Sequence, residues 1–588
     1  MVTYAERPWL KHYDPDVPTS LAPYPDLPLF QFLRDAARHS PERTALVTSA
    51  HLPIAGRVAR EMSYGELDRQ SDALAAALGA MGLKKGDRVA LVMPNIAAFV
   101  ISFYGVLKAG GVVAAVNPTF PAEKLQYFVD DCDAEIVITM SLFYQAIKSI
   151  QARTKAKTII VTNVKEYLPG AAKVLFTLAK EKKQGHRVSQ LAEGDVWLQD
   201  VLIRYAGQTP SVEVSGGDLC IFQYTGGTTG TSKAAMSTHR ALVANTLHCR
   251  TWLLGSKAEG HDEIFLGAIP MFHVFGMVAV LSLAVGLGAK VVLVPNARDI
   301  GDVVDVIRHF KPSIFQGVPA LYNAIAECAG VKTGKISLRS IRYCISGSAP
   351  LPPALKRRWE DLSGGKLIEG FGMSEAPTAS HCNPLRGENR AGSIGLPFPD
   401  MDMRIVSLDD GETDVPVGEI GELVMTGPQV MVGYHNVDDE TAPALRQKDG
   451  KLWLHTGDIA RMDEDGYFTI VDRKKDLVLI GGFNVYPNHV EKVLADHPGV
   501  LDVGVAGILH PDKLGQEALK AWVVVRHGER VTREALIDHA RKHLAPYEVP
   551  TRIAFIDAIP KSVVGKILRR ELVEMEIAEQ QSKVGVPA

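Results

Sequence analysis

A recurring unit of helix, tight turn and short apolar run restricts the fold of this chain more than any other feature. Ser63 and Glu66 have the spacing of a helix-capping box, and apolar residues then recur at helical intervals up to Met81. A Lys-Lys-Gly-Asp turn at 84–87 leads to the apolar run 89–93, which predicts a buried strand. The same alternation returns at 288–294, 300–310 and 314–318. The pattern predicts stacked α/β layers.

The texture changes near residue 472, where a charged run, Asp-Arg-Lys-Lys-Asp at 472–476, precedes Gly481 and Gly482. A compact mixed α/β stretch follows to the end. With 588 residues, the chain is long enough for a large compound body and a smaller unit. We therefore expect an N-terminal domain at 1–474 and a C-terminal domain at 475–588.

Composition excludes several classes of protein. Hydrophobic residues are 46% and charged residues 22%, values that are typical of globular proteins and not of disordered or fibrous ones. Lys plus Arg is 64 against 67 for Asp plus Glu, and no basic block stands out, so nucleic acid is not an expected partner. The six cysteines are widely spaced without a CxxC pair, which favours reduced, buried thiols.

Three segments bear on location. Residues 1–16 lack the apolar run of a signal peptide, so we expect the protein in the cytoplasm. The apolar windows 96–107 and 274–289 are shorter than the ~20 residues that span a bilayer, and we interpret both as buried elements. Segment 164–187 mixes apolar residues with lysines; it fits either a solvated helix or peripheral contact with the inner surface of an anionic membrane.

The strongest local motif is the loop Tyr-Thr-Gly-Gly-Thr-Thr-Gly-Thr-Ser-Lys at 224–233. Its glycines let backbone N–H groups close on an anion, and its hydroxyls and one ammonium add donors, so it predicts a polyphosphate-binding loop. The alternative is a plain surface turn. Thr231 and Ser232 separate Gly230 from Lys233, whereas an ordinary P-loop has lysine directly after this glycine. The sequence is therefore not that of an ordinary P-loop NTPase.

At this loop the chain resembles the adenylate-forming superfamily, which includes acyl-CoA synthetases, peptide synthetase adenylation domains and luciferases. The other motifs of that family follow in its order: Pro-Met-Phe-His at 270–273, Ser-Gly-Ser-Ala-Pro at 346–350, Gly-Phe-Gly-Met-Ser-Glu at 370–375, Trp-Leu-His-Thr-Gly-Asp at 453–458, the run 472–476, and 560–566. The resemblance implies a large body with two α/β sheets, helices and a small β-barrel-like subdomain, followed by a small mobile α+β domain.

The resemblance also implies the site. It assigns catalytic roles to Lys566, His273 and Glu375, a metal site to Glu375 and Thr225, and the pantetheine tunnel of coenzyme A to Gly481 and Gly482. It assigns ATP binding to Thr225, Gly226, Gly227, Thr228, Thr229, Gly230, Lys233, Gly347, Ser348, Phe371, Gly372, Ser374, Asp458, Arg473 and Lys475.

Each assigned role has a chemical reason. The Glu375 carboxylate suits Mg²⁺ held against phosphates. Phe371 replaces an aromatic, commonly Tyr, that stacks on adenine in the family. The carboxylate of Asp458, after a Thr-Gly pair interpreted as a turn, can accept both ribose hydroxyls, with Arg473 as its partner. The Lys566 ammonium would stabilise charge that develops at the α-phosphate, and His273 resembles the gate beside the acyl carboxylate.

The expected reaction needs no enzyme nucleophile, because the substrate carboxylate attacks the α-phosphorus of MgATP and pyrophosphate leaves. Coenzyme A (CoA) then takes the acyl group after a pivot at Lys475, the family's hinge position. Nearly the whole chain matches bacterial long-chain fatty acid:CoA ligases, except at Ala234, Phe371 and His489, where Gly, Tyr and Glu are usual.

The resemblance therefore predicts an AMP-forming long-chain fatty acid:CoA ligase that uses Mg²⁺, ATP and CoA. Medium-chain or aromatic acid:CoA ligases and acyl-AMP ligases that load a carrier protein stay open as alternatives, with a luciferase-like monooxygenase behind them. A homodimer is also left open. One sequence does not reveal the residues that shape an acyl tunnel.

Overall fold

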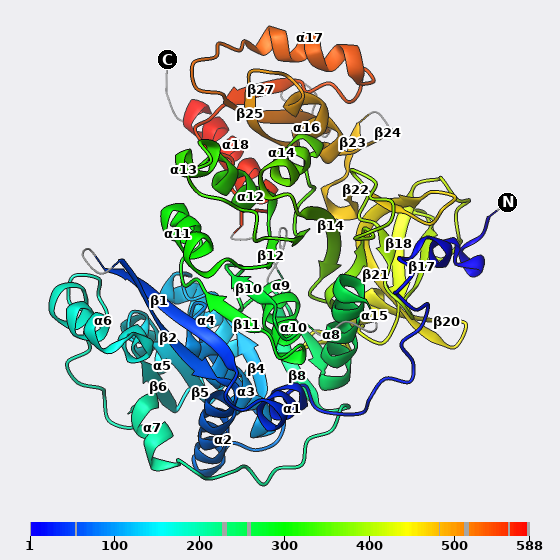
Figure 1. Ribbon diagram of the computed structural model, residues 1–588. Helices are drawn as coiled ribbons and strands as arrows, with labels where there is room; N and C mark the ends of the chain where they lie inside the picture. Colours follow the sequence, from blue (N-terminus) through cyan, green and yellow to red (C-terminus); the bar gives the residue numbers. More distant parts are fainter. Residues whose placement is uncertain are drawn as a thin grey trace.

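The computed structural model describes residues 2–52, 56–225, 232–255, 260–480, 483–510, 517–562 and 565–584. The chain forms two large α/β layers, a smaller antiparallel sheet and a C-terminal α/β unit (Figure 1). Figure 1 shows the C-terminal unit, in orange and red, over the large body. The expectation of an α/β fold with several sheets is confirmed.

The first large sheet has nine strands, a parallel centre and antiparallel edges. Its strands in spatial order are β16 (Leu396–Pro397), β15 (Ala376–Cys382), β14 (Lys366–Met373), β13 (Tyr343–Ser346), β12 (Ile314–Gly317), β10 (Ile264–Gly267), β11 (Lys290–Leu293), β1 (Thr44–Leu52) and β2 (Gly56–Ser63).

The second large sheet has eight strands and is parallel except at one edge. Its strands in spatial order are β19 (Gly433–Tyr434), β9 (Ala234–Thr238), β8 (Leu219–Tyr224), β4 (Val112–Ala115), β3 (Arg88–Val92), β5 (Ile136–Met140), β6 (Thr158–Thr162) and β7 (Val196–Trp197). The polyphosphate loop starts where β8 ends.

One layer of helices lies between the two large sheets, since its side chains share a single apolar core with both. These helices are α1 (Gln31–His39), α2 (Tyr64–Ala80), α3 (Ala97–Lys108), α8 (His239–Leu254), and the stretch α9 (Val274–Gly276), η5 (Met277–Ser282) and α10 (Leu283–Gly286). The outer faces carry α4 (Ala122–Asp131) and α5 (Tyr144–Gln151) on one sheet and α11 (Ile300–Phe310), α12 (Pro319–Glu327), α13 (Ala329–Lys332) and α14 (Pro353–Ser363) on the other.

The helix-turn-strand predictions are confirmed at residue level. The Ser63 hydroxyl accepts the backbone N–H of Glu66 and starts α2, and β3 follows the turn at 84–87. Every residue of α3 is buried, as is the stretch from Val274 to Val285. Both apolar windows are therefore core elements, and no helix of the described residues has the length and apolarity needed to cross a membrane.

The third sheet has five antiparallel strands and corresponds to the expected small β-barrel-like subdomain. Its strands are β17 (Asp402–Val406), β18 (Gly421–Thr426), β20 (Leu445–Lys448), β21 (Lys451–Met462) and β22 (Phe468–Arg473), with α15 (Asp438–Ala444) leading into β20.

The C-terminal unit begins after the short helix η6 (Lys474–Asp476) and has its own apolar clusters. Its elements are the hairpin β23 (Val478–Ile480) and β24 (Phe483–Val485), α16 (Pro487–Ala495), β25 (Val500–Leu509), β26 (Glu517–Val525), α17 (Arg533–His543), β27 (Arg552–Phe555) and α18 (Arg569–Val584). The apolar clusters of the C-terminal unit contain only residues after 477, close to the predicted boundary between 474 and 475. The boundary itself stays a prediction.

The cysteines match the expectation of reduced thiols, whereas the segment 164–187 is helical only in part. The segment forms η3 (Val164–Tyr167), α6 (Gly170–Leu175) and η4 (Phe176–Lys180), and the helical part ends at Lys180. Val174, Leu175 and Leu178 are exposed on it, the last by 82%. All six cysteines are free; five are buried, and Cys328 is half-buried.

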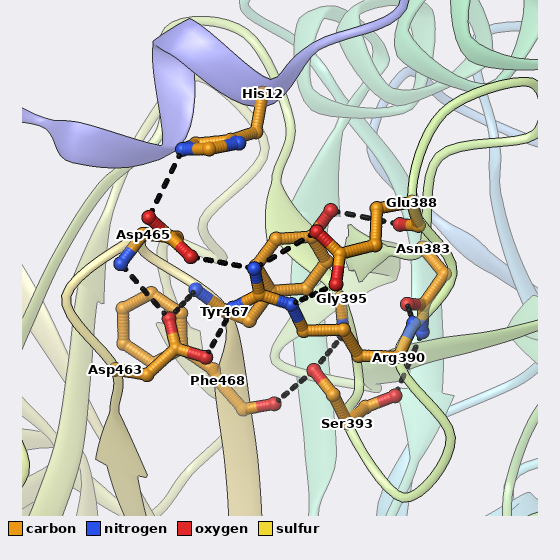
Figure 2. Close-up of polar contacts among 10 residues, drawn as sticks. All are labelled: His12, Asn383, Glu388, Arg390, Ser393, Gly395, Asp463, Asp465, Tyr467 and Phe468. Carbon is orange, nitrogen blue, oxygen red and sulfur yellow. Dashed lines mark hydrogen bonds and ion pairs between the residues drawn. The ribbon is translucent and has the colours of Figure 1, made fainter.

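A polar cluster ties the N-terminal segment to the third sheet (Figure 2). Arg390 donates to Glu388, Asp463 and Asp465 at 2.5–2.9 Å, and its guanidinium lies 4.0 Å from the centre of the Tyr467 ring. His12 lies 3.4 Å from the second oxygen of Asp465. One arginine therefore joins the loop after β15 to the turn between β21 and β22.

Candidate active site

One cavity of about 1130 Å³ lies where the ends of all three sheets meet the C-terminal unit. It is lined by most of the site residues that the sequence predicts: Thr225, Lys233, His273, Gly347, Ser348, Phe371, Gly372, Ser374, Glu375, Arg473, Lys475 and Lys566. The predicted residues Gly226, Gly227, Thr228, Thr229, Gly230, Gly481 and Gly482 lie outside the described residues.

The two described ends of the polyphosphate loop are fastened together. The Thr225 N–H donates to the Lys233 carbonyl at 2.8 Å, and the Lys233 N–H donates to the Thr225 hydroxyl at 3.3 Å. The Tyr127 hydroxyl donates to the Ser232 carbonyl from α4. The Lys233 ammonium contacts the Glu440 carboxylate of α15 and lies 5.2 Å from the Tyr434 ring centre. A polyphosphate would meet a cation that already has an anionic partner.

Glu375 lies in the turn between β14 and β15. Its Oε1 accepts the Tyr434 hydroxyl at 2.9 Å, and its carbonyl accepts the Met431 N–H at 2.8 Å. Gly370, Phe371 and Gly372, which precede it, all belong to β14. A Cβ on Gly372 would lie 1.5 Å from the Thr378 carbonyl oxygen, so the close approach of β15 requires glycine here.

Asp458 and Arg473 face each other across the pairing of β21 with β22. Asp458 Oδ1 lies 2.9 Å from Arg473 Nε, while its buried Oδ2 has no hydrogen-bond partner among the described residues. The Thr-Gly pair before Asp458 is not a turn but part of β21, where Gly457 has a positive φ of 68° and the pairing with β18 shifts register. Gly457 lines the cavity, whereas Asp458, the next residue, is buried and does not itself line it.

Lys566 comes from the C-terminal unit into the cavity, next to groups from the large body. Burial, reinforced by the charge of Arg473, lowers the pKa of Lys566 to about 8. Burial and the charge of Lys566 lower the pKa of His273 to about 4, so this imidazole is neutral at pH 7. Its Nδ1 accepts the Phe275 N–H at 3.2 Å, which leaves Nε2 as the protonated nitrogen. Burial, aided by Arg473, also lowers the pKa of Lys475.

Sequence reasoning missed Glu422, a carboxylate of β18 that lines the same cavity. Glu422 Oε1 accepts the Gly457 N–H at 3.1 Å, and Oε2 lies 3.0 Å from Lys474 Nζ and 3.6 Å from His455 Nδ1. Burial alone would raise the pKa of Glu422, but His455 and Lys474 outweigh it and lower the pKa to about 2. A lone carboxylate in the apolar run 421–425 is the sequence signal that could have found it.

Sequence reasoning also could not locate the apolar part of the cavity. Phe275, Ala279 and Leu283 follow one another at four-residue spacing along the stretch from α9 to α10, and all three line the cavity. Trp252 of α8 also lines the cavity. Its indole N–H donates to the carbonyl of Asn383, a residue far away in sequence, at 3.0 Å, and this hydrogen bond fixes the ring. Cys249, Cys382 and Phe398 complete this apolar part.

The donor set fits a magnesium ion that is shared with substrate phosphates. Within the described residues, no cluster of three or more His, Cys, Asp or Glu side chains offers a full protein cage for a metal. Glu375 and Thr225 instead supply one carboxylate and one hydroxyl on the wall of a cavity. Mg²⁺ usually takes one or two carboxylates and completes its shell with water and phosphate oxygens.

Comparison with known proteins decides the family. The model of the AMP-binding enzyme family matches residues 33–435, and the model of the AMP-binding enzyme C-terminal domain matches residues 489–566. The chain belongs to the AMP-binding enzyme family. The two matches leave residues 436–488 between them, and this interval holds Asp458, Arg473 and Lys475.

Relatives of this AMP-binding enzyme match over nearly its full length. It is 38% identical to a long-chain-fatty-acid–CoA ligase of Bacillus subtilis, over 98% of this chain and 100% of that protein. It is 35% identical to a ligase of the same name from Yersinia pestis, over 97% and 98%. The crystal structure of ATP-bound MatB from Rhodopseudomonas palustris superposes with a TM-score of 0.78 at 26% identity, over 93% of this chain and 99% of that one.

Proposed function

We propose that this AMP-binding enzyme joins a fatty acid to CoA, with ATP converted to AMP and pyrophosphate through an acyl adenylate. The observation that carries the proposal is that one cavity combines two chemistries. Its polar part holds Thr225, Lys233, Glu375 and Lys566, and its apolar part runs past Phe275, Ala279 and Leu283. A fatty acid has this division, with an anionic head and an apolar chain.

The first step is in-line attack of the acid's carboxylate on the α-phosphorus of ATP. A new carboxyl–phosphate bond forms, and the bond to pyrophosphate breaks. Lys566 is protonated at neutral pH and places positive charge beside the α-phosphate and the incoming carboxylate. Neutral His273 stands beside the carboxylate without adding charge.

The remaining polar residues bind and orient the nucleotide. Asp458, next to the cavity-lining Gly457, accepts a ribose hydroxyl, and Phe371, with Gly347 and Ser348, forms the wall for adenine. The Lys233 ammonium gives up its contact with Glu440 and binds the phosphates that leave as pyrophosphate. Mg²⁺, when held by Glu375 and Thr225, supplies charge neutralisation at the phosphates.

The second step transfers the acyl group to the CoA thiol. Lys566 withdraws as the C-terminal unit pivots at Lys475, and the opposite face of that unit approaches the adenylate, with Gly481 and Gly482 assigned to the passage of the pantetheine arm. The CoA thiol gives its proton to solvent and its sulfur attacks the acyl carbon. A carbon–sulfur bond forms, the bond from that carbon to the bridging oxygen breaks, and AMP leaves with this oxygen and the electron pair. No covalent enzyme intermediate is needed.

The decisive experiment measures AMP and thioester formation by the purified protein with ATP, Mg²⁺, CoA and fatty acids of graded length. Aromatic acids serve as the competing class. We expect CoA-dependent AMP release that is greatest with long-chain acids. Release of AMP without thioester would support a carrier-loading acyl-AMP ligase, and failure with every acid would overturn the proposal.

The apolar part of the cavity offers a test of chain length. Ala279→Leu adds volume between Phe275 and Leu283, so we expect longer acids to lose activity while the shortest accepted acids keep it. An unchanged KM for ATP is the internal control for a folded site. An equal loss of activity at every length would contradict the placement of the acyl chain here.

We also propose that the protein works in the cytoplasm with peripheral contact at the membrane. Val174, Leu175 and Leu178 are exposed on α6 and η4, with Lys173, Lys180 and Lys182 close in sequence. Leu178→Asp should weaken sedimentation with anionic vesicles, and equal sedimentation of both proteins would contradict the contact. A homodimer stays a prediction, to be tested by light scattering.

A further inference from the structure

Side chains on the two sides of Lys475 are attached to different parts of the molecule. Residues 473 and 474 are held by the five-stranded sheet, whereas Asp476 is held by the C-terminal unit. Figure 1 shows the chain passing here from β22, in the third sheet, to β23 in the C-terminal unit. Only the structure reveals the contacts on each side, because the sequence shows only a run of charged residues at 472–476.

The attachment before Lys475 rests on two carboxylates of the third sheet. Asp458 of β21 holds Arg473 at 2.9 Å. Glu422 of β18 holds Lys474 at 3.0 Å. The Glu422 side chain is only 4% exposed, and its other oxygen accepts the Gly457 N–H, one residue before Asp458. Glu422 therefore links Lys474, the residue before Lys475, to β21, the strand that carries Asp458.

The attachment after Lys475 rests on one arginine of α18. Arg569 Nη1 lies 3.2 Å from Asp476, and its Nη2 lies 2.9 Å from Glu491 of α16. The same guanidinium donates to the Val505 carbonyl of β25 at 2.9 Å. Asp476 is thus fixed to three elements of the C-terminal unit and would move with them.

One further contact crosses the junction. Asp472, a fully buried residue of β22, accepts the backbone N–H of Asn488 at 2.8 Å and its side-chain amide at 3.1 Å. Asn488 lies in the first turn of α16. This contact belongs to the arrangement with Lys566 in the cavity, and it would break when the C-terminal unit turns.

We infer that Glu422 is a positioning residue for the second half-reaction: by holding Lys474 against the third sheet, it confines the turn of the C-terminal unit to Lys475. This inference rests on the proposed function. Without this ion pair, the Glu422–Lys474 clamp, the chain can bend at residue 474 as well as at Lys475. The C-terminal unit then docks less precisely beside the adenylate. Loss of this ion pair should not slow the first half-reaction. The hydrogen bond from Asn488 to Asp472 holds the arrangement with Lys566 in the cavity, and it does not involve Lys474.

The test removes the clamp and measures the two half-reactions separately. Lys474→Met keeps the stem of the side chain and loses its charge. We expect acid-dependent exchange of pyrophosphate into ATP to change by less than about twofold, and transfer from preformed acyl adenylate to CoA to slow by about tenfold. Glu422→Gln keeps an acceptor for the Gly457 N–H, so it should show the same split.

Lys451→Met is the matched control, since Lys451 pairs with Asp402 on the same sheet, away from the pivot. It should change neither half-reaction. The double variant of Glu422 and Lys474 should be no slower in transfer than either single variant, because both remove one contact. Equal slowing of both half-reactions, no slowing of transfer, or additive effects would each overturn the inference. A wild-type protein without exchange or transfer would overturn the proposed function as well.

Discussion

At the scale of single residues, the site depends on charges that the fold brings close together. Lys566, Arg473 and Lys475 gather near Asp458 and Glu375, and the pKa of Lys566 falls to about 8 through burial and the charge of Arg473. A lysine with this pKa is mostly charged at pH 7 and loses its charge in the mildly alkaline range. This proximity makes the first half-reaction sensitive to pH.

The kcat/KM for ATP in pyrophosphate exchange should therefore fall as pH rises through about 8, because free enzyme loses the Lys566 proton. Lys566→Arg keeps a positive charge to higher pH, so its profile should lack this limb even if its maximum is lower. The measurement is a pH–rate profile of both proteins at constant ionic strength. An identical limb in both would assign the ionisation to another group.

The contact of Lys233 with Glu440 predicts an effect on ATP affinity. The Glu440 carboxylate must leave the lysine before polyphosphate binds, and ion pairs between partly exposed side chains contribute about 0.2–1 kcal/mol. Glu440→Gln should therefore lower the Kd for ATP by up to about fivefold, as measured by calorimetry at low salt. Asp438→Asn in the same helix is the control, and equal shifts in both variants would indicate only a general change of charge.

At the scale of elements, irregularities in strands place the polar groups. Gly372 lets β15 approach β14, and the register shift near Gly457 turns Asp458 toward Arg473. The loop before β16 is held by Arg390 and its carboxylates, in addition to the core packing of Leu385 and Ile394 (Figure 2). This partly exposed cluster links the loop to the turn between β21 and β22.

Replacing the central arginine should destabilise this edge. Arg390→Met leaves Glu388, Asp463 and Asp465 without their shared cation. Because these carboxylates are 46–60% exposed, we expect a loss of about 0.2–1 kcal/mol in the free energy of unfolding. The measurement is denaturant unfolding, with Arg404→Met as the control. Arg404 is equally exposed, 25%, but it lies 3.2 Å from the carboxylate of Asp449 and 3.8 Å from that of Asp414. A larger loss in the control would contradict the role of the cluster.

At the scale of the whole molecule, the cavity exists only because two units meet. Lys561, Ser562 and Lys566 from the C-terminal unit close a space whose other walls come from three sheets. Two half-reactions with different needs at one site would explain why the closing residues come from a separate unit.

Gly482, outside the described residues, gives a test at this scale. Gly482→Leu should spare acid-dependent pyrophosphate release and abolish thioester formation, since a side chain there would narrow the path of the pantetheine arm. Gly79→Leu is the control, because no atom lies within 4 Å of a Cβ at that exposed position. Equal loss of both steps in Gly482→Leu would refute the role.

The sequence by itself determined what depends on local order along the chain. Capping and spacing predicted α2 and β3, apolar windows predicted the buried α3 and the stretch before α10, and ordered motifs identified the family. These features are local, so neighbouring residues suffice to encode them.

Only the tertiary structure decided which distant groups meet. Glu422 with Lys474, Glu440 with Lys233, and Trp252 with Asn383 join residues far apart in sequence, and no spacing rule links them. One local interpretation also failed, because the Thr-Gly pair before Asp458 is turn-like in composition, yet it is an irregular part of the strand β21. Strand pairing and charge burial act through space, and only the folded chain brings their partners together.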